Sequence, residues 1–249
     1  MNDLYFDRIL LTGPVAPESY LADIPAVRWL QQTGELRLNR RVTILVGENG
    51  AGKSTLLEAI AVAYGFNPEG GTLNFSFATE DSHSELWRHI RLAKHRRPRD
   101  GFFLRAESFY NMATYIDRHD ADPESGDDII TGFGGVSLHH RSHGESFLAA
   151  VQNRFGGHGL YLLDEPEAAL SPTKLMTLLV EIDRLVAADS QLILATHSPM
   201  LMAYPEAEVL ELSEDGIHPV DYRETEHYLV MRSFLENPKR MFDLLRERD

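Results

Sequence analysis

The sequence contains no cysteine, which excludes disulfide bonds and cysteine-ligated metal sites. Positive charge is also scarce: 24 Lys and Arg stand against 38 Asp and Glu, a formal net charge of −14. A surface of this sign as a whole disfavours binding to nucleic acid or anionic lipid. No apolar run approaches the roughly 20 residues that a membrane span needs, so no direct membrane insertion is expected. Residues 1–8 lack a basic stretch followed by an apolar one, so no signal peptide is predicted. We therefore expect a cytoplasmic protein.

Apolar segments that read as strands alternate with amphipathic segments that read as helices. Strands are predicted at 42–46, 102–104, 160–163 and 191–196, and helices at 54–64 and 173–188. This alternation favours an α/β domain with a mostly parallel sheet. Towards the end, 209–212 and 217–220 predict a hairpin, and two helices at 225–236 and 239–248 are separated by Asn237-Pro238.

With 249 residues and 43% hydrophobic content, the chain is large enough to bury one sizeable core. We predict a single domain over 1–249. Its core lobe covers about 1–80 and 148–249. The polar, loop-rich segment of about 81–147 forms a smaller helical lobe.

A complete phosphate-loop motif follows the first predicted strand, because residues 47–54 read G-E-N-G-A-G-K-S. Its glycines let backbone N–H groups turn towards phosphate oxygens at the start of a helix. Lys53 is expected to reach the β- and γ-phosphates of ATP, and the Ser54 hydroxyl to ligate Mg²⁺. The predicted nucleotide-binding residues of this motif are Asn49, Gly50, Ala51, Gly52, Lys53, Ser54 and Thr55.

Two adjacent carboxylates, Asp164 and Glu165, end the fully apolar strand at 160–163. Ligands of open parallel sheets bind at the carboxyl ends of the strands. Asp164 is therefore predicted to hold Mg²⁺ with Ser54. Glu165 is predicted to orient or deprotonate the water that attacks ATP.

The order of these motifs resembles the ABC-type ATPases over 42–199. Residues 160–167 resemble the second nucleotide motif of that family with its catalytic Glu, and 168–171 resemble its dimer-interface loop. Residues 196–199, T-H-S-P, resemble its switch-histidine motif. The resemblance implies a P-loop NTPase head that hydrolyses ATP with Mg²⁺, with Glu165 and His197 as catalytic residues.

Residues 142–146, S-H-G-E-S, take the place of the family's signature sequence. They differ from the transporter pattern and resemble the soluble SMC- and RecF-related branch and small bacterial predicted ATPases. The resemblance implies that Ser142, Gly144 and Glu145 bind the nucleotide of a second subunit, giving a homodimer in the ATP state. The span between Lys53 and Asp164 shows no heptad pattern, so no coiled-coil arm is expected.

Glu107 stands where transporter-type members carry a Gln ahead of the signature. An acid at this place is predicted to ligate Mg²⁺ or the attacking water. Tyr20, Arg28 and Trp29 are candidates for stacking on adenine, but none lies in a matching motif and none is assigned.

Three functions compete at this point. The first is a stand-alone ATP-driven dimerisation switch in DNA-related or defence processes, acting with an effector protein or DNA. The second is the nucleotide-binding subunit of a membrane transporter. The third is a nucleotide-dependent interaction module with negligible turnover. The segment Arg88 to Arg99 holds six Lys or Arg and no acid. It is the one hint of nucleic acid, and a solvated helix face is the competing explanation.

Overall fold

The computed structural model describes residues 3–73, 84–105, 109–121, 129–135, 137 and 143–246. Its centre is a seven-stranded sheet with the strand order β10-β9-β3-β8-β7-β6-β4. The five strands β9, β3, β8, β7 and β6 run parallel, while β4 and β10 pair antiparallel at the two edges. The strands are β3 (Val42–Gly47), β4 (Gly71–Thr72), β6 (Asp100–Arg105), β7 (Gly159–Asp164), β8 (Gln191–Ala195), β9 (Ala207–Ser213) and β10 (Gly216–Pro219). The predicted α/β class with a mostly parallel sheet is confirmed.

The central strands are apolar along their whole length because both faces of the sheet are covered. Every residue of β3, β7 and β8 is buried. Side chains along β7 alternate between two cores: Leu160 and Leu162 lie in one, and Tyr161 and Leu163 in the other. This alternation is the period of two that a pleated strand imposes.

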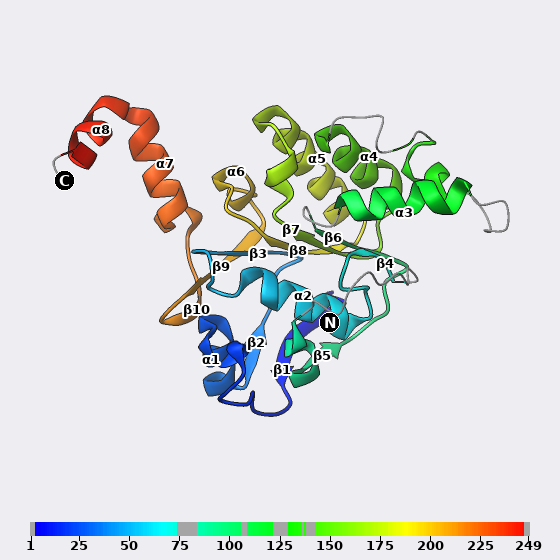
Figure 1. Ribbon diagram of the computed structural model, residues 1–249, viewed down its shortest axis with the longest axis horizontal. Coiled ribbons are helices and arrows are strands. Elements are labelled where there is room, and N and C mark those ends of the chain that lie inside the picture. Colours follow the sequence, from blue (N-terminus) through cyan, green and yellow to red (C-terminus); the bar gives the residue numbers. More distant parts are fainter. Residues whose placement is uncertain are drawn as a thin grey trace.

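Helices cover both faces of this sheet (Figure 1). One face carries α3 (Phe109–Ala121), α4 (His143–Arg154), α5 (Pro172–Ala187) and the short α6 (Pro199–Met202). The other face carries α1 (Pro25–Thr33) and α2 (Lys53–Tyr64). Short 3-10 turns complete the connections: η1 (Tyr20–Asp23), η2 (Glu85–His89), η3 (Ile129–Phe133), η5 (Pro166–Ala169) and η6 (Tyr222–Glu224). In the part of the chain described, no helix combines the length and apolarity that crossing a bilayer requires.

A second, three-stranded antiparallel sheet lies beyond α2, with the order β2-β1-β5. Its strands are β1 (Phe6–Leu11), β2 (Glu35–Arg37) and β5 (Ile90–Lys94). Both β5 and β6 fall within 81–147, the segment expected to form the smaller helical lobe. These two strands of the segment therefore belong to the sheets, and its α-helices, α3 and α4, begin after Arg105. The division of the chain into two lobes stays a prediction.

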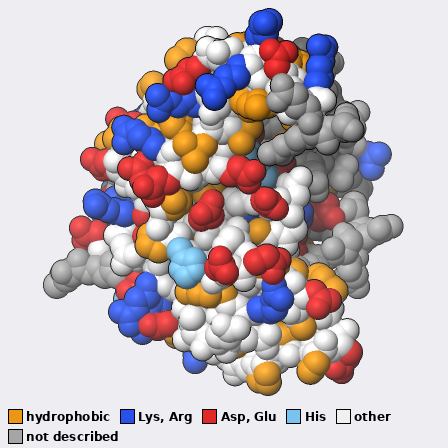
Figure 2. Space-filling model, turned by 90° about the vertical axis from the view of Figure 1, so that its left-hand side faces the viewer, with side chains coloured by type: hydrophobic (Ala, Val, Ile, Leu, Met, Phe, Trp, Pro, Cys, Tyr) orange, Lys and Arg blue, Asp and Glu red, His pale blue; other side chains and the backbone are white. Residues whose placement is uncertain are grey.

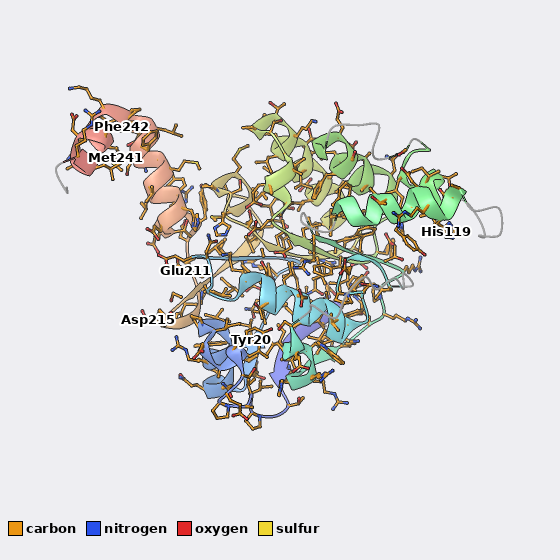
Figure 3. All side chains as sticks on the ribbon, in the orientation of Figure 1. Tyr20, His119, Glu211, Asp215, Met241 and Phe242 are labelled. Atoms are coloured by element: carbon orange, nitrogen blue, oxygen red, sulfur yellow. The ribbon has the colours of Figure 1, made fainter. Side chains whose placement is uncertain are left out.

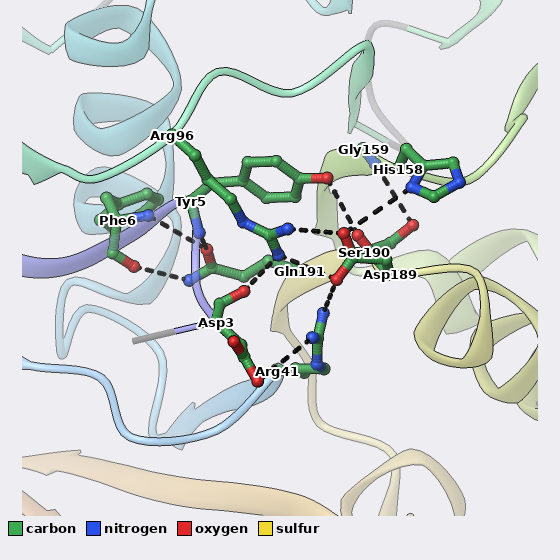
Figure 4. A network of polar contacts seen from close by, with 10 residues as sticks. All are labelled: Asp3, Tyr5, Phe6, Arg41, Arg96, His158, Gly159, Asp189, Ser190 and Gln191. Atoms are coloured by element: carbon green, nitrogen blue, oxygen red, sulfur yellow. Dashed lines mark hydrogen bonds and ion pairs between the residues drawn. The ribbon is translucent and has the colours of Figure 1, made fainter. Parts of the chain in front are cut away.

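A partly buried polar network connects the N-terminal strand to the large sheet (Figure 4). The Gln191 side chain accepts hydrogen bonds from the Tyr5 and Phe6 backbone N–H groups and donates to Phe6 O. Asp189 pairs with Arg41 and Arg96, and these contacts hold the pKa of the Asp189 carboxyl well below its usual range. Arg96 also lies over the Tyr5 ring, 4.2 Å from its centroid.

The C-terminal segment departs from the body as a helical arm (Figure 1). After the hairpin β9–β10 come α7 (Glu226–Glu236) and α8 (Pro238–Arg246), which are separated at Asn237 as predicted. Neither helix contains a buried residue. Figure 3 shows Met241 and Phe242 on α8, away from the sheets.

Candidate functional site

The loop between β3 and α2 packs closely against neighbouring segments at both of its ends. Gly47 has φ 134°, and a Cβ there would lie 2.1 Å from Leu212 O. Gly52 has φ 101°, and a Cβ there would lie 2.5 Å from Ile24 Cγ2. Glycine is required at both positions because an L side chain has neither the space nor the backbone conformation.

Lys53 begins α2 and is 5% exposed. Its ammonium donates hydrogen bonds to Gly47 O at 2.8 Å and Glu48 O at 2.9 Å, so it lies inside the curve of the loop. Burial lowers the pKa of Lys53, and the charges of Glu165 and Asp164 oppose this shift. The positive charge of Lys53 is therefore held in place inside the curve of the loop.

Asp164 lies opposite Ser54 at the carboxyl end of β7. The Ser54 hydroxyl donates to Asp164 Oδ1 at 2.9 Å, and Arg105 Nε lies 3.7 Å from Asp164 Oδ2. A hydroxyl and a carboxylate are hard oxygen donors of the kind that Mg²⁺ prefers. Among the described side chains no group of three His, Asp or Glu could hold a metal. The pair thus fits Mg²⁺ held by few protein ligands together with phosphate oxygens and water.

Glu165 follows Asp164 in the left-handed conformation, with φ 47° and ψ 51°. Its backbone N–H donates to Ala195 O at 2.9 Å, which ties it to the end of β8. Its side chain is 44% exposed, and Oε1 lies 3.7 Å from His197 Nε2. Glu165 therefore presents a solvent-accessible carboxylate beside Lys53 and His197.

His197 follows β8 and has partners on two sides. Its backbone N–H donates to Glu167 Oε1 at 2.5 Å, and its Nδ1 lies 2.7 Å from His227 Nε2 on α7. Burial, with the nearby charges of Lys53 and His227, lowers the pKa of His197 to about 4. The imidazole is therefore neutral at pH 7 and carries a single ring hydrogen.

Two cavities meet at this edge of the sheet. A cavity of about 960 Å³ lies between the loop and α7. Its walls are Glu48, Asn49, Glu165, His197, Glu226, His227, Val230, Met231 and Phe234. A second, of about 660 Å³, lies between the loop and the hairpin, and its lining includes Asp23, Glu48, Glu211, Glu214, Asp215 and Glu226.

Figure 3 shows Glu211 and Asp215 along this hairpin, and in Figure 2 acidic side chains gather across the middle of this side of the molecule. A polyphosphate entering here needs cations to offset the acidic walls.

Two family models match parts of the sequence. Residues 24–102 match a family described as "AAA domain". Residues 136–203 match one described as "AAA domain, putative AbiEii toxin, Type IV TA system". No curated protein matches the chain.

The fold is similar to that of solved ABC cassettes. One is described as "An inward-facing conformation of a putative metal-chelate type ABC transporter", with a TM-score of 0.50 and 14% identity over 92% of this chain and 88% of that one. Another is cbiO1 from Clostridium perfringens, described as part of the ABC transporter complex cbiONQ. It has a TM-score of 0.49 and 15% identity, covering 97% of this chain and 99% of that one. The first of these structures has the same fold as this chain. In this chain the phosphate loop and Asp164 meet at one edge of the sheet. This chain is a P-loop protein with the ABC ATPase fold.

The ABC-type fold places most of the predicted site residues at one edge. These are Asn49, Gly50, Ala51, Gly52, Lys53, Ser54 and Thr55 on the loop and the first turn of α2, Asp164 and Glu165 after β7, and His197 after β8. Gly144 and Glu145 lie in the first turn of α4, away from that loop in the sequence. Ser142 and Glu107 lie outside the described residues.

Gly144 packs tightly against the segment that resembles the dimer-interface loop of the ABC family. A Cβ on Gly144 would lie 2.5 Å from Ala169 O and 3.3 Å from Lys174 Nζ. Glycine is therefore needed here for packing within the chain. The expected contact of Gly144 with a second subunit's nucleotide stays a prediction.

Two residues of this candidate site were not anticipated from the sequence. Arg105 ends β6 in register with Asp164 and bonds Glu58 Oε2 at 2.8 Å. Part of its signal was available, because Arg105 directly follows the strand predicted at 102–104. His227 had no such signal, since no motif links it to His197 thirty positions earlier.

The candidates for adenine contact make other contacts. Trp29 packs beneath the hairpin, where a Cβ on Gly216 would lie 2.0 Å from its ring. Arg28 pairs with Glu214. Tyr20 is 60% exposed.

The basic segment from Arg88 to Arg99 is not the expected helix face, because it forms the end of η2, strand β5 and the turn after it. Several of its charges have partners within the chain. Arg96 pairs with Asp189, Arg88 pairs with Glu85, and Lys94 donates to Tyr64 O at the end of α2. Arg91, Arg97 and Arg99 are exposed.

Proposed function

We propose that this protein binds ATP with Mg²⁺ at the edge formed by the phosphate loop, Asp164, Glu165 and His197, and hydrolyses it. The observation that carries the proposal is the bond between the Ser54 hydroxyl and Asp164 Oδ1, 2.9 Å long, beside the buried Lys53. Two oxygen donors from separate motifs already converge where a phosphate-bound metal would lie.

Each side chain has a distinct role in the proposed reaction. Lys53 binds the β- and γ-phosphates, and Ser54 and Asp164 would hold Mg²⁺, whose charge offsets that of the phosphates. Glu165 accepts a hydrogen bond from the attacking water and orients it in line with the γ-phosphate. His197, neutral and 3.7 Å from Glu165, donates a hydrogen bond to the γ-phosphate from Nε2.

The proposal is tested by ATP turnover of Glu165→Gln against the unchanged protein. Loss of the orienting carboxylate is expected to lower kcat by at least about 100-fold while ATP binding persists. Glu226→Gln is the matched control, because it removes a carboxylate from the wall of the same cavity without touching the proposed water. Equal turnover in Glu165→Gln and Glu226→Gln would refute the assignment of Glu165.

The second part of the proposal is that ATP joins two copies of the chain. The phosphate loop covers only one side of a bound nucleotide, and the exposed cavity above it leaves the other side open. Residues 142–146, with Ser142, Gly144 and Glu145, are proposed to close over the nucleotide of a second copy related by a two-fold axis. ATP would then stabilise the dimer by mass action.

Light scattering on Glu165→Gln tests the dimer. With saturating ATP and Mg²⁺ this variant is expected to run as a dimer, and adding Ser142→Arg is expected to return it to a monomer that still binds ATP. A Glu165→Gln protein that stays monomeric with ATP refutes the homodimer and favours a different partner subunit, as in a transporter.

Nucleic acid is the proposed partner of the three exposed arginines Arg91, Arg97 and Arg99, which support this role by their exposure alone. If they contact phosphates, affinity for duplex DNA falls steeply with salt, and reversing the three charges abolishes it. Absence of DNA binding at low salt with ATP present removes this partner.

A further inference from the structure

His227 brings the C-terminal arm into contact with the nucleotide edge. It is the second residue of α7, and its Nε2 lies 2.7 Å from His197 Nδ1. The two rings lie 4.8 Å apart and are inclined at 53°. Both histidines line the cavity above the phosphate loop, together with Glu165. Thirty residues separate them in the sequence, so the contact depends on the placement of α7.

Two ring nitrogens at this distance require one hydrogen between them, carried by one nitrogen and accepted by the other. A neutral His197 has one ring hydrogen to place. If Nδ1 carries the hydrogen, Nε2 has only a lone pair, and it faces Glu165 Oε1 at 3.7 Å. Two hydrogen-bond acceptors, Nε2 and Oε1, then oppose each other. If Nε2 carries it, His197 donates towards Glu165 and the space of the proposed γ-phosphate. That second arrangement requires His227 to be the donor.

We infer that His227 is a positioning residue, whose Nε2–H donates to His197 Nδ1 and thereby keeps the His197 hydrogen on Nε2, where it points at the nucleotide. The inference rests on the proposed function for its consequence, since the γ-phosphate is the acceptor that His197 would serve. The part of the inference that does not depend on ATP is which nitrogen of His197 carries the hydrogen. The partner of a histidine commonly fixes this choice.

The contact between His227 and His197 links the C-terminal arm, α7 and α8, to the proposed hydrolysis of ATP. α7 begins with Glu226 and His227 at the cavity wall and continues through Val230, Met231 and Phe234 along it. A shift of α7 away from the loop would remove the donor from His197 Nδ1. His197 would then be free to carry its hydrogen on either nitrogen.

The test compares His227→Gln with His227→Glu at pH 8. The Gln side-chain amide can donate as the imidazole does, whereas an ionised Glu only accepts and would draw the hydrogen to His197 Nδ1. Both should fold, because no residue of α7 is buried and an acid near a helix N-terminus is favourable. The readouts are the ¹⁵N NMR signature of the His197 ring, assigned by its loss in His197→Gln, and the steady-state kinetics of ATP hydrolysis.

The unchanged protein and His227→Gln are expected to show His197 protonated at Nε2 and to turn over ATP at similar rates. His227→Glu is expected to show protonation at Nδ1, and its kcat should fall at least about tenfold because an oriented donor is lost, with KM little changed. A His197 protonated at Nδ1 in the unchanged protein overturns the inference whatever the activity. A correct signature in a protein that hydrolyses no ATP refutes the proposed function instead, and the placement of the hydrogen stands.

Discussion

Ser54 donates its hydroxyl hydrogen to Asp164 across 110 positions of sequence, at 2.9 Å. One residue belongs to the first turn of α2 and the other ends β7, and β8 lies between β7 and β3 in the sheet. The contact therefore shows that the start of α2 and the end of β7 lie side by side at the same edge of the sheet. The fold itself brings the two proposed Mg²⁺ ligands together.

Ser54→Ala tests this metal site. Removing the hydroxyl is expected to raise the Mg²⁺ concentration needed for half-maximal ATP turnover, because Asp164 then holds the ion with one protein oxygen fewer. Ser54→Thr is the matched control, since the motif accepts either hydroxyl. A titration in which the Ala and Thr variants need the same Mg²⁺ concentration would place the ion elsewhere.

Lys53→Ala is expected to weaken ATP binding by about 10- to 150-fold, since a charged hydrogen-bond partner contributes roughly 1.5–3 kcal/mol. The loop also loses the two bonds from the ammonium to Gly47 O and Glu48 O. Calorimetry with ATP and Mg²⁺ measures the change. Lys239→Ala, on the exposed arm, removes the same charge where the side chain is 91% exposed, and its affinity should match that of the unchanged protein.

Gly144→Ala is expected to lower the free energy of unfolding by about 1–3 kcal/mol, the usual cost of forcing an extra group into a packed site. The new methyl group would meet Ala169 O at 2.5 Å. Gly13→Ala makes the same substitution where nothing lies within 4 Å and should have little effect. Urea unfolding of the two variants decides whether Gly144 is needed for packing, and equal stabilities would contradict it.

Gln191→Leu is expected to destabilise the fold by about 2–4 kcal/mol, because buried backbone groups of Tyr5 and Phe6 lose their partners. Tyr5 N, Phe6 N and Phe6 O all bond to this side chain, which is fully buried. Gln152→Leu on the exposed face of α4 is the control. A thermal midpoint for Gln191→Leu close to that of the control would show that the network contributes little.

The α/β class and the main elements followed from the sequence because each has a strong local pattern. The strands β3, β7 and β8 are continuous apolar runs, and α5 shows a clear amphipathic period. The phosphate loop and Asp164 followed because motifs of fixed spacing imply a shared sheet edge. The hairpin and the break at Asn237 followed from turn residues and proline.

What did not follow depends on contacts between distant segments. The three-stranded sheet was missed because β2 has only three residues and β5 lies in a basic stretch that resembled a helix face. The charges of that stretch are explained by partners far away in the sequence, such as Asp189 for Arg96. His227 was missed for the same reason, since nothing near it in the sequence indicates that α7 begins beside β8.

The backbone of Glu165 has a consequence for how this protein can change. A residue with a Cβ in the left-handed conformation carries a cost of roughly 1–2 kcal/mol that glycine or asparagine largely avoids. Glu165→Gly or Glu165→Asn would relieve this backbone strain and raise the free energy of unfolding, so the chain would tolerate other destabilising mutations better. The same substitutions would remove the proposed water-orienting carboxylate. The stability of the fold and the proposed role of Glu165 in turnover therefore place opposite demands on this residue.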